Sequence, residues 1–110
     1  MKRMKFKGFI IRVSFLWVEG IALFPFVLVK NRMPNRALLN HECIHLRQQL
    51  EMGFILFYIW YSVEYFIRYL QIRNHYQAYR RISFEREAFA EETSYSYLRT
   101  RSFWAFLKYL

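Results

Sequence analysis

Two histidines four residues apart form the strongest chemical signal in this sequence. His41 and His45 enclose Glu42 in an H-E-x-x-H pattern, within a stretch that we expect to be helical. One helical turn separates two such imidazoles, so both can reach the same metal ion. Glu42 points away from the edge that the histidines share, and from there it can take a proton from water instead of binding the ion. This is the core chemistry of zinc-dependent peptide hydrolysis.

A helix over residues 35–53 would position this pattern. Pro34-Asn35 predicts a turn, with Asn35 as the residue that caps the helix. Apolar residues recur at helical spacing with the two histidines, which directs both rings inward. Gly53 marks the expected end of the helix, and Cys43 falls on another side of it, where we expect it to pack. The alternative is that the histidines are ordinary core or surface side chains.

A zinc site that also holds water needs a third protein ligand. The segment 83–92 is the best source, because four of the eight acidic residues of the chain fall within it. His75, the only other histidine, follows a long apolar segment and has no spacing typical of such a ligand. Each glutamate of the segment, taken singly, could equally belong to a solvated helix face. The residues alone therefore leave the third ligand open among these acids.

Two motifs together give the chain a family resemblance. The H-E-x-x-H pattern and the later E-x-E-A pattern, Glu85-Arg86-Glu87-Ala88, are similar to those of gluzincins. More closely, the segments 40–49, 60–61, 64–65, 78–80 and 84–88 resemble a family of small bacterial zincin-like proteins of Bacteroidetes type. The resemblance covers residues 20 to 92. It implies Zn²⁺ bound by His41, His45 and Glu85, with Glu42 as the general base.

One position departs from the gluzincin pattern. Many gluzincins place Asp or Asn after the alanine, whereas this chain has Phe89, which removes a hydrogen bond to a histidine ligand. Glu85 and Glu87 point about 200° apart on a helix, and of the two we choose Glu85 as the ligand.

Other polar residues are candidates for supporting roles. A Tyr or His often stabilises the oxyanion in zincins, and the sequence offers His75, Tyr76 and Tyr79 without choosing among them. Gln48 and Gln49 either order the site or pack, and packing is the stronger expectation.

The length of 110 residues predicts a single domain over residues 1–110, small for a peptidase. We expect an α+β fold, mainly α: a minimal zincin-like helical core with a short N-terminal β hairpin or edge strand. Pro25 would lie at an edge or a bend. The expected parts are a basic and apolar lead-in (1–19), a short β region (20–33), the H-E-x-x-H helix (35–53), an apolar helix (54–72), and the third-ligand helix with a basic, aromatic C-terminus (82–108).

The apolar helix raises the question of what covers it. Its length is just short of the roughly twenty residues that span a bilayer, and Glu64 and Arg68 are spaced to form an ion pair. A membrane surface, a partner subunit or the protein's own fold could cover it. The segment 95–110 either lies among lipid head groups or closes the core as an amphipathic helix. Arg12 interrupts the lead-in, so we expect no signal peptide and a location in the cytoplasm or peripheral to the inner membrane.

The net charge of +9 also suggests nucleic acid, but the bases are spread along the chain and the aromatics lie in apolar runs. We expect no nucleic-acid partner. The predicted function is a zinc-dependent metallopeptidase that cleaves a peptide or protein substrate, at a membrane surface or in solution. The alternative is a non-catalytic zincin-like subunit of a larger, membrane-associated assembly with a structural metal site. A third hypothesis is a basic membrane- or nucleic-acid-binding protein in which the histidine pair is accidental.

Overall fold

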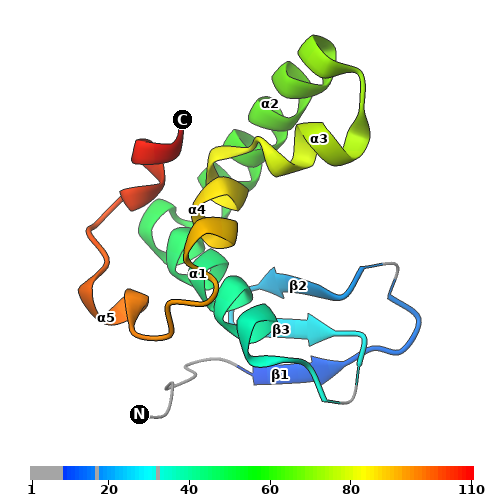
Figure 1. Cartoon of the computed structure of the whole chain (residues 1–110), viewed down its shortest axis with the longest axis vertical. Helices are drawn as coiled ribbons and strands as arrows, with labels where there is room; N and C mark the ends of the chain where they lie inside the picture. Colours follow the sequence, from blue (N-terminus) through cyan, green and yellow to red (C-terminus); the bar gives the residue numbers. More distant parts are fainter. Residues whose placement is uncertain (1–8, 17, 32) are drawn as a thin grey trace.

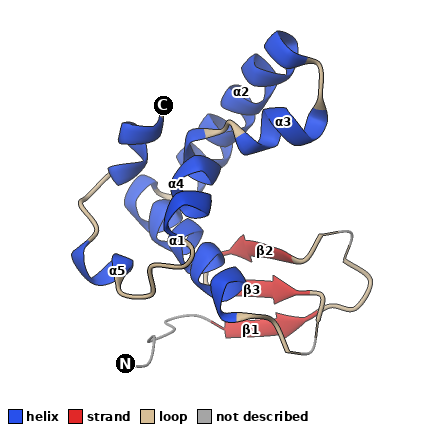
Figure 2. Ribbon diagram, viewed as in Figure 1, coloured by secondary structure: helices blue, strands red, loops and turns tan. Residues whose placement is uncertain are grey.

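The computed structural model describes residues 9–16, 18–31 and 33–110. Within these residues the chain forms one three-stranded sheet, five α-helices and a C-terminal 3₁₀ helix (Figures 1 and 2). The expected α+β class with mainly helix is confirmed. The elements are β1 (Phe9–Arg12), β2 (Gly20–Leu23), β3 (Phe26–Val29), α1 (Arg36–Met52), α2 (Phe54–Ile72), α3 (His75–Arg80), α4 (Ser83–Glu91), α5 (Tyr97–Thr100) and η1 (Ala105–Tyr109).

The sheet contains the expected hairpin. β2 and β3 are antiparallel around a turn at Phe24-Pro25, where the peptide bond is cis, so Pro25 does lie at a bend. β1 pairs with β3 in parallel, which places β2 at one edge of the sheet. β1 lies within residues 1–19, for which the sequence predicted a basic and apolar lead-in and no particular secondary structure. The basic residues of that lead-in before Phe9 lie outside the described residues.

α1 packs against β2 and β3 through a small apolar core. Val27 and Val29 are fully buried beneath it, together with Leu46 of the helix. Gln49 adds polar links: its Oε1 accepts from the Phe24 amide and its Nε2 donates to the Ala22 carbonyl, both at 2.8 Å. We expected Gln49 simply to pack; instead it ties α1 to the hairpin.

The predicted limits of α1 are confirmed. Asn35 caps it by accepting a 2.7 Å hydrogen bond from the Leu38 amide. Gly53 ends it with a φ of 71°, which glycine adopts without the strain that a side chain adds. The chain turns by 114° there into α2, so α1 and α2 diverge from a common corner (Figure 1).

α2 contributes to a second, aromatic core. Phe57 is buried against Phe84 of α4, and Phe84 in turn contacts Phe106 of η1. The prediction of an ion pair between Glu64 and Arg68 is wrong, because the Glu64 carboxylate accepts hydrogen bonds from Trp60 and Ser83 instead.

Glu64 accepts a hydrogen bond at the start of α4, whereas Arg68 bonds to a residue of its own helix, α2. The Glu64 carboxylate accepts from the Ser83 amide and from Trp60 Nε1, both at 2.7 Å, which satisfies an otherwise free N–H at the start of α4. Arg68 donates to Gln71 at 3.2 Å.

The C-terminal segment does not form one amphipathic helix. Residues 95–110 include α5 and η1, joined by a short irregular segment with a turn, and η1 packs on α4 with Phe106 fully buried. Between the two short helices, Arg101 forms ion pairs with Glu51 of α1 and Glu87 of α4. Core closure by Phe106 and a buried ion-pair network therefore hold this segment.

No helix in the described part of the chain combines the length and the apolar character needed to cross a bilayer alone. α1 and α2 meet those criteria only when they are taken together, as a pair bent by 114°.

Candidate metal centre

α1 and α4 cross and bring the two predicted motifs together (Figure 1). Asn40, fully buried on α1, donates to the backbone carbonyls of Glu91 and Glu92 at 3.1 and 2.9 Å. These carbonyls lie at the end of α4, where helical carbonyls lack partners within the helix. Asn40 therefore fixes the end of α4 directly beside His41.

The three predicted ligands converge at this crossing. His41 Nε2 and His45 Nε2 each lie 3.0 Å from Glu85 Oε1. All three side chains are buried, and their ligand atoms lie within 4.8 Å of one another. Cys43 is also buried but is not part of the cluster, in keeping with the expectation that it packs.

Each histidine has a second partner behind it. His41 Nδ1 is 2.8 Å from Glu92 Oε1, and His45 Nδ1 is 2.8 Å from Gln48 Oε1. The amide orientation of Gln48 is fixed because its Nε2 donates to the Phe84 carbonyl and to Glu87. Both partners of the rings are thus acceptors, so both Nδ1 atoms carry the proton.

This tautomer creates a site for positive charge. In a neutral ring with its proton on Nδ1, Nε2 presents a lone pair, and both Nε2 atoms face Glu85 Oε1. Three electron-rich atoms therefore meet, and either a proton or a cation must lie among them. In the protein without an ion, burial disfavours a charged His45, but the Glu85 carboxylate outweighs burial and raises the pKa of His45 to about 9.

Glu85 is held on its far side by a tyrosine. Tyr61 of α2 donates its hydroxyl to Glu85 Oε2 at 2.6 Å, leaving Oε1 for the histidines. Burial works against ionisation of Glu85, yet the two imidazoles beside it lower its pKa. Burial and the Glu85 carboxylate raise the pKa of Tyr61, which keeps the phenol a donor.

Glu87 lies on the other side of α4, as the helical spacing predicts. It accepts from Tyr97, from Arg101 and from Gln48. Its carboxylate is saturated by these donors and takes no part in the cluster with the histidines. The structure thus places Glu85, the residue chosen from the resemblance, beside the rings.

Glu42 lies beside the three converging residues without joining them. It is buried, and burial raises the pKa of its carboxyl group. A Cβ built on Gly20 of β2 would lie 3.4 Å from its Oε2, so the Glu42 carboxyl group lies against this strand. A carboxyl group with a raised pKa is suited to exchange protons near neutral pH.

The three candidates for oxyanion stabilisation separate in the structure. His75 is exposed and its Nδ1 pairs with the Tyr65 hydroxyl at 2.7 Å, while Tyr76 is 57% exposed. Tyr79 is half-buried, and burial together with the Glu85 carboxylate raises its pKa. Among these three, Tyr79 is the one within electrostatic range of the cluster.

Sequence reasoning missed three supporting residues. Gln48 was expected to pack but positions His45, and Glu92 supplies the carboxylate that Phe89 cannot. Phe89 instead sets its ring against that of His41, with centroids 4.5 Å apart. Tyr61 belongs to the segment 60–61 that carries the family resemblance, which was the available signal, but its hydroxyl reaches Glu85 only through the packing of α2 near α4.

No protein-family model, curated protein or solved structure matches the chain. The geometry of the described residues therefore carries the functional argument.

Proposed function

We propose that the protein is a zinc-dependent metallopeptidase, with His41, His45 and Glu85 as the metal ligands. The observation that carries this proposal is the meeting of two Nε2 lone pairs and one carboxylate oxygen in a buried place, each fixed from behind by a further side chain. Two imidazoles and a carboxylate are a typical ligand set of catalytic zinc. Partners behind the ligands raise their affinity for the ion.

The residues around the ligands supply the remaining chemistry. When bound, Zn²⁺ would polarise a carbonyl oxygen and lower the pKa of water. Glu42 takes the proton of the water whose oxygen attacks the peptide carbonyl. As the C–N bond breaks, Glu42 returns that proton to the leaving amine. Tyr79, which is within electrostatic range of Glu85, is our candidate donor of a hydrogen bond to the developing oxyanion.

The edge of the sheet offers a place for the substrate backbone. Glu19 and Lys30 form a hydrogen-bonded pair across the hairpin, so Gly20, one residue on, turns its amide and carbonyl to the outer edge of β2. This edge passes Glu42. An extended peptide that pairs with Gly20 therefore lies next to the general base.

Replacement of Glu42 by Gln tests the proposal. Zn²⁺ should stay bound with one ion per chain, because Glu42 is not a ligand, whereas hydrolysis of a peptide library should fall by at least about a hundredfold. Metal analysis and product detection by mass spectrometry measure the two effects. Peptidase activity that survives in Glu42→Gln, or a wild-type chain that binds no metal, would refute the assignment.

A second candidate function is a non-catalytic subunit with a structural metal site. The observation that favours it is the apolar surface of α2, where Ile55, Ile59 and Phe66 are 76%, 56% and 62% exposed. Under this alternative, wild type binds Zn²⁺ but cleaves no peptide, and Glu42→Gln leaves its biological activity unchanged.

A further inference from the structure

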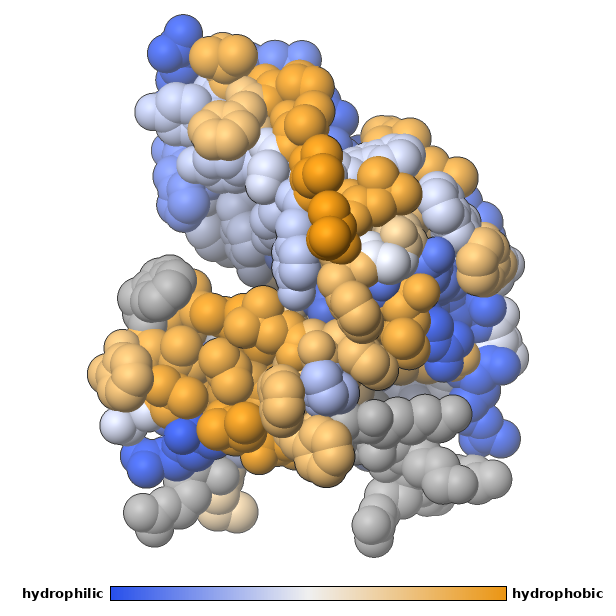
Figure 3. Space-filling model, turned by 180° about the vertical axis from the view of Figure 1, so that it is seen from behind, coloured by the Kyte–Doolittle hydropathy of each residue, from blue (hydrophilic) through white to orange (hydrophobic). Residues whose placement is uncertain are grey.

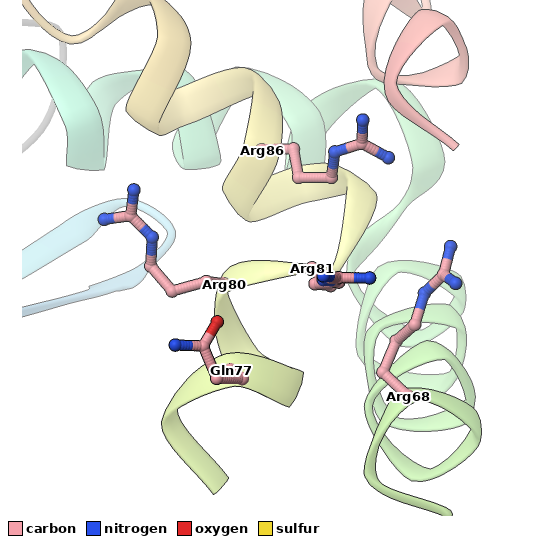
Figure 4. A pocket seen from close by; sticks show the side chains of 5 residues that line it. All are labelled: Arg68, Gln77, Arg80, Arg81 and Arg86. Carbon is pink, nitrogen blue, oxygen red and sulfur yellow. The ribbon is translucent and has the colours of Figure 1, made fainter. Parts of the chain in front are cut away.

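A hollow lined by arginines lies apart from the candidate metal centre. Its volume is about 320 Å³, and three helices and a turn contribute to it (Figure 4). Arg68 comes from α2, Gln77 and Arg80 from α3, Arg81 from the turn that follows, and Arg86 from α4. Four of the five lining side chains therefore carry a permanent positive charge.

No carboxylate of the described residues forms an ion pair with these arginines. The lining contains no acidic residue, and none of its arginines forms an ion pair within the described ranges 9–16, 18–31 and 33–110. Glu64, one turn before Arg68, is engaged by Ser83 and Trp60. Four like charges gathered without counter-charges are unfavourable, and an anion in the hollow would relieve this repulsion.

The arginines are also partly held in place. Arg86 donates to the Tyr109 carbonyl at 2.6 Å, and Arg68 donates to Gln71 at 3.2 Å. In Figure 4 the side chains of Arg68, Arg81 and Arg86 extend to one side of the turn, whereas Arg80 extends to the other. Arg80 stacks on the Phe89 ring at 3.7 Å and adds its charge from there.

We propose that this hollow is a binding site for a phosphate group. Guanidinium groups present N–H donors in pairs that match two oxygens of a phosphate, and fixing one N–H to a backbone carbonyl leaves the others for a ligand. Two chemical sources could provide the phosphate: a free phosphate or pyrophosphate ion, and the head group of an anionic phospholipid. The site does not depend on the metal or on peptide hydrolysis.

The side chains around the hollow bear on whether a lipid or a free ion supplies the phosphate. Phe66, Ile67 and Leu70 are neighbours of Arg68 in α2 and are 62%, 49% and 62% exposed, but Phe66 and Leu70 point about 200° away from it on the helix. A phospholipid membrane would therefore have to reach round α2 to contact these side chains as well as the arginines. A free ion would use only the arginines.

The first arm of the test measures binding of inorganic pyrophosphate by calorimetry. The double variant Arg81→Gln/Arg86→Gln removes two charges from the hollow, and Arg12→Gln/Arg99→Gln removes two from exposed positions outside it. For a free-ion site, the dissociation constant should rise by about tenfold or more in the first variant, because charge-assisted hydrogen bonds are lost. It should change by less than about twofold in the second, where only long-range charge is lost.

The second arm measures co-sedimentation with phosphatidylcholine vesicles that contain phosphatidic acid, and with vesicles given the same surface charge by oleate. The phosphate belongs to a lipid if wild type binds the phosphatidic acid vesicles more tightly than the oleate vesicles and does not bind pyrophosphate. In that case Arg81→Gln/Arg86→Gln should lose the tighter binding, whereas Arg12→Gln/Arg99→Gln should keep it. The phosphate belongs to a free ion if wild type binds pyrophosphate and Arg81→Gln/Arg86→Gln loses this binding. Failure to bind either probe, or equal weakening in both double variants, overturns the site. Should the double variant misfold, Arg81→Gln alone, at an exposed position, gives the same decision.

Discussion

At the scale of single residues, the candidate centre depends on which nitrogen of each histidine carries the proton. Gln48 and Glu92 decide this, because each presents an acceptor oxygen to an Nδ1 atom. Gln48 is itself fixed by donating to Glu87 and to the Phe84 carbonyl. The orientation of the two imidazole rings is therefore set by side chains outside the cluster of His41, His45 and Glu85.

Replacement of Gln48 by Leu should weaken Zn²⁺ binding by about 10- to 100-fold, because His45 loses the partner that orients its ring. Competition with a chromophoric chelator measures this change. Gln49→Leu is the matched control: Gln49 is an adjacent, equally buried residue of the same helix, but its hydrogen bonds go to the hairpin. An equal loss of affinity in both variants would contradict the role given to Gln48.

Gly20 tests the position of Glu42, the proposed general base. A methyl group there would meet Leu38 Cδ1 at 3.3 Å, so that side chain must give by a few tenths of an ångström, and it would touch Glu42 Oε2 at 3.4 Å. We expect Gly20→Ala to lower peptide hydrolysis by about tenfold, since the methyl group crowds the proposed base and small displacements of a catalytic group are costly, with Zn²⁺ affinity unchanged. Steady-state kinetics and metal titration measure the two quantities, and full activity in Gly20→Ala would contradict a substrate path past Gly20 and Glu42.

Local spacing predicted the residues that meet at the crossing but not those that support them. His41, Glu42 and His45 lie within one helical turn, so their relation follows from helix geometry alone. Glu85 came from the resemblance, and helical spacing put Glu87 on the opposite side. Contacts across helices, such as that of Tyr61, depend on crossing angles that no local pattern encodes.

At the scale of elements too, local patterns predicted some features, and contacts between distant segments determined the others. The limits of α1 and the β2–β3 hairpin follow from local signals: the Asn35 cap, Gly53 and Pro25. β1 was missed because its four residues are all exposed and show no alternation of burial. The C-terminal segment was misjudged because Arg101 fixes it through distant carboxylates.

Arg101 joins three parts of the chain, and its removal should be costly. Its guanidinium is buried between Glu51 and Glu87, whose side chains are 5% and 0% exposed. Arg101→Ala leaves two buried carboxylates without their partner, so the free energy of unfolding should fall by about 3 kcal/mol. Urea denaturation measures it, with Arg99→Ala at an exposed position as the control, for which we expect a change within about 0.5 kcal/mol. Similar losses in the two variants would argue against this network.

At the scale of the whole molecule, apolar side chains remain on the outside. Figure 3 shows a broad apolar surface over the sheet and further apolar side chains along α2. On the strands, Phe9, Ile11 and Phe26 are 63%, 41% and 41% exposed. Phe57 is the only buried residue of α2 in the structure as described. Apolar patches of this kind mark surfaces that other molecules cover.

This surface predicts self-association of the isolated protein. Ile59→Lys/Phe66→Lys should raise the monomer fraction in sedimentation velocity, because it places charge on the apolar face of α2. Ser62→Lys adds a charge at an exposed site on the same helix without removing apolar area and should have a smaller effect. A monomeric wild-type chain, or equal effects of the two changes, would contradict the prediction.

The hydrogen bonds of Gln49 limit how long a ligand can run beside the hairpin. Ala22 already uses its outward carbonyl and Phe24 its amide on this glutamine, so along β2 only Gly20 keeps both its amide and its carbonyl for a newcomer. A peptide that docks there would form one full hydrogen-bonded residue pair, with Gly20, before it reaches the Gln49 side chain. Recognition would then rest on a short stretch around the scissile bond, a geometry that favours trimming of chain ends over cutting within long extended segments.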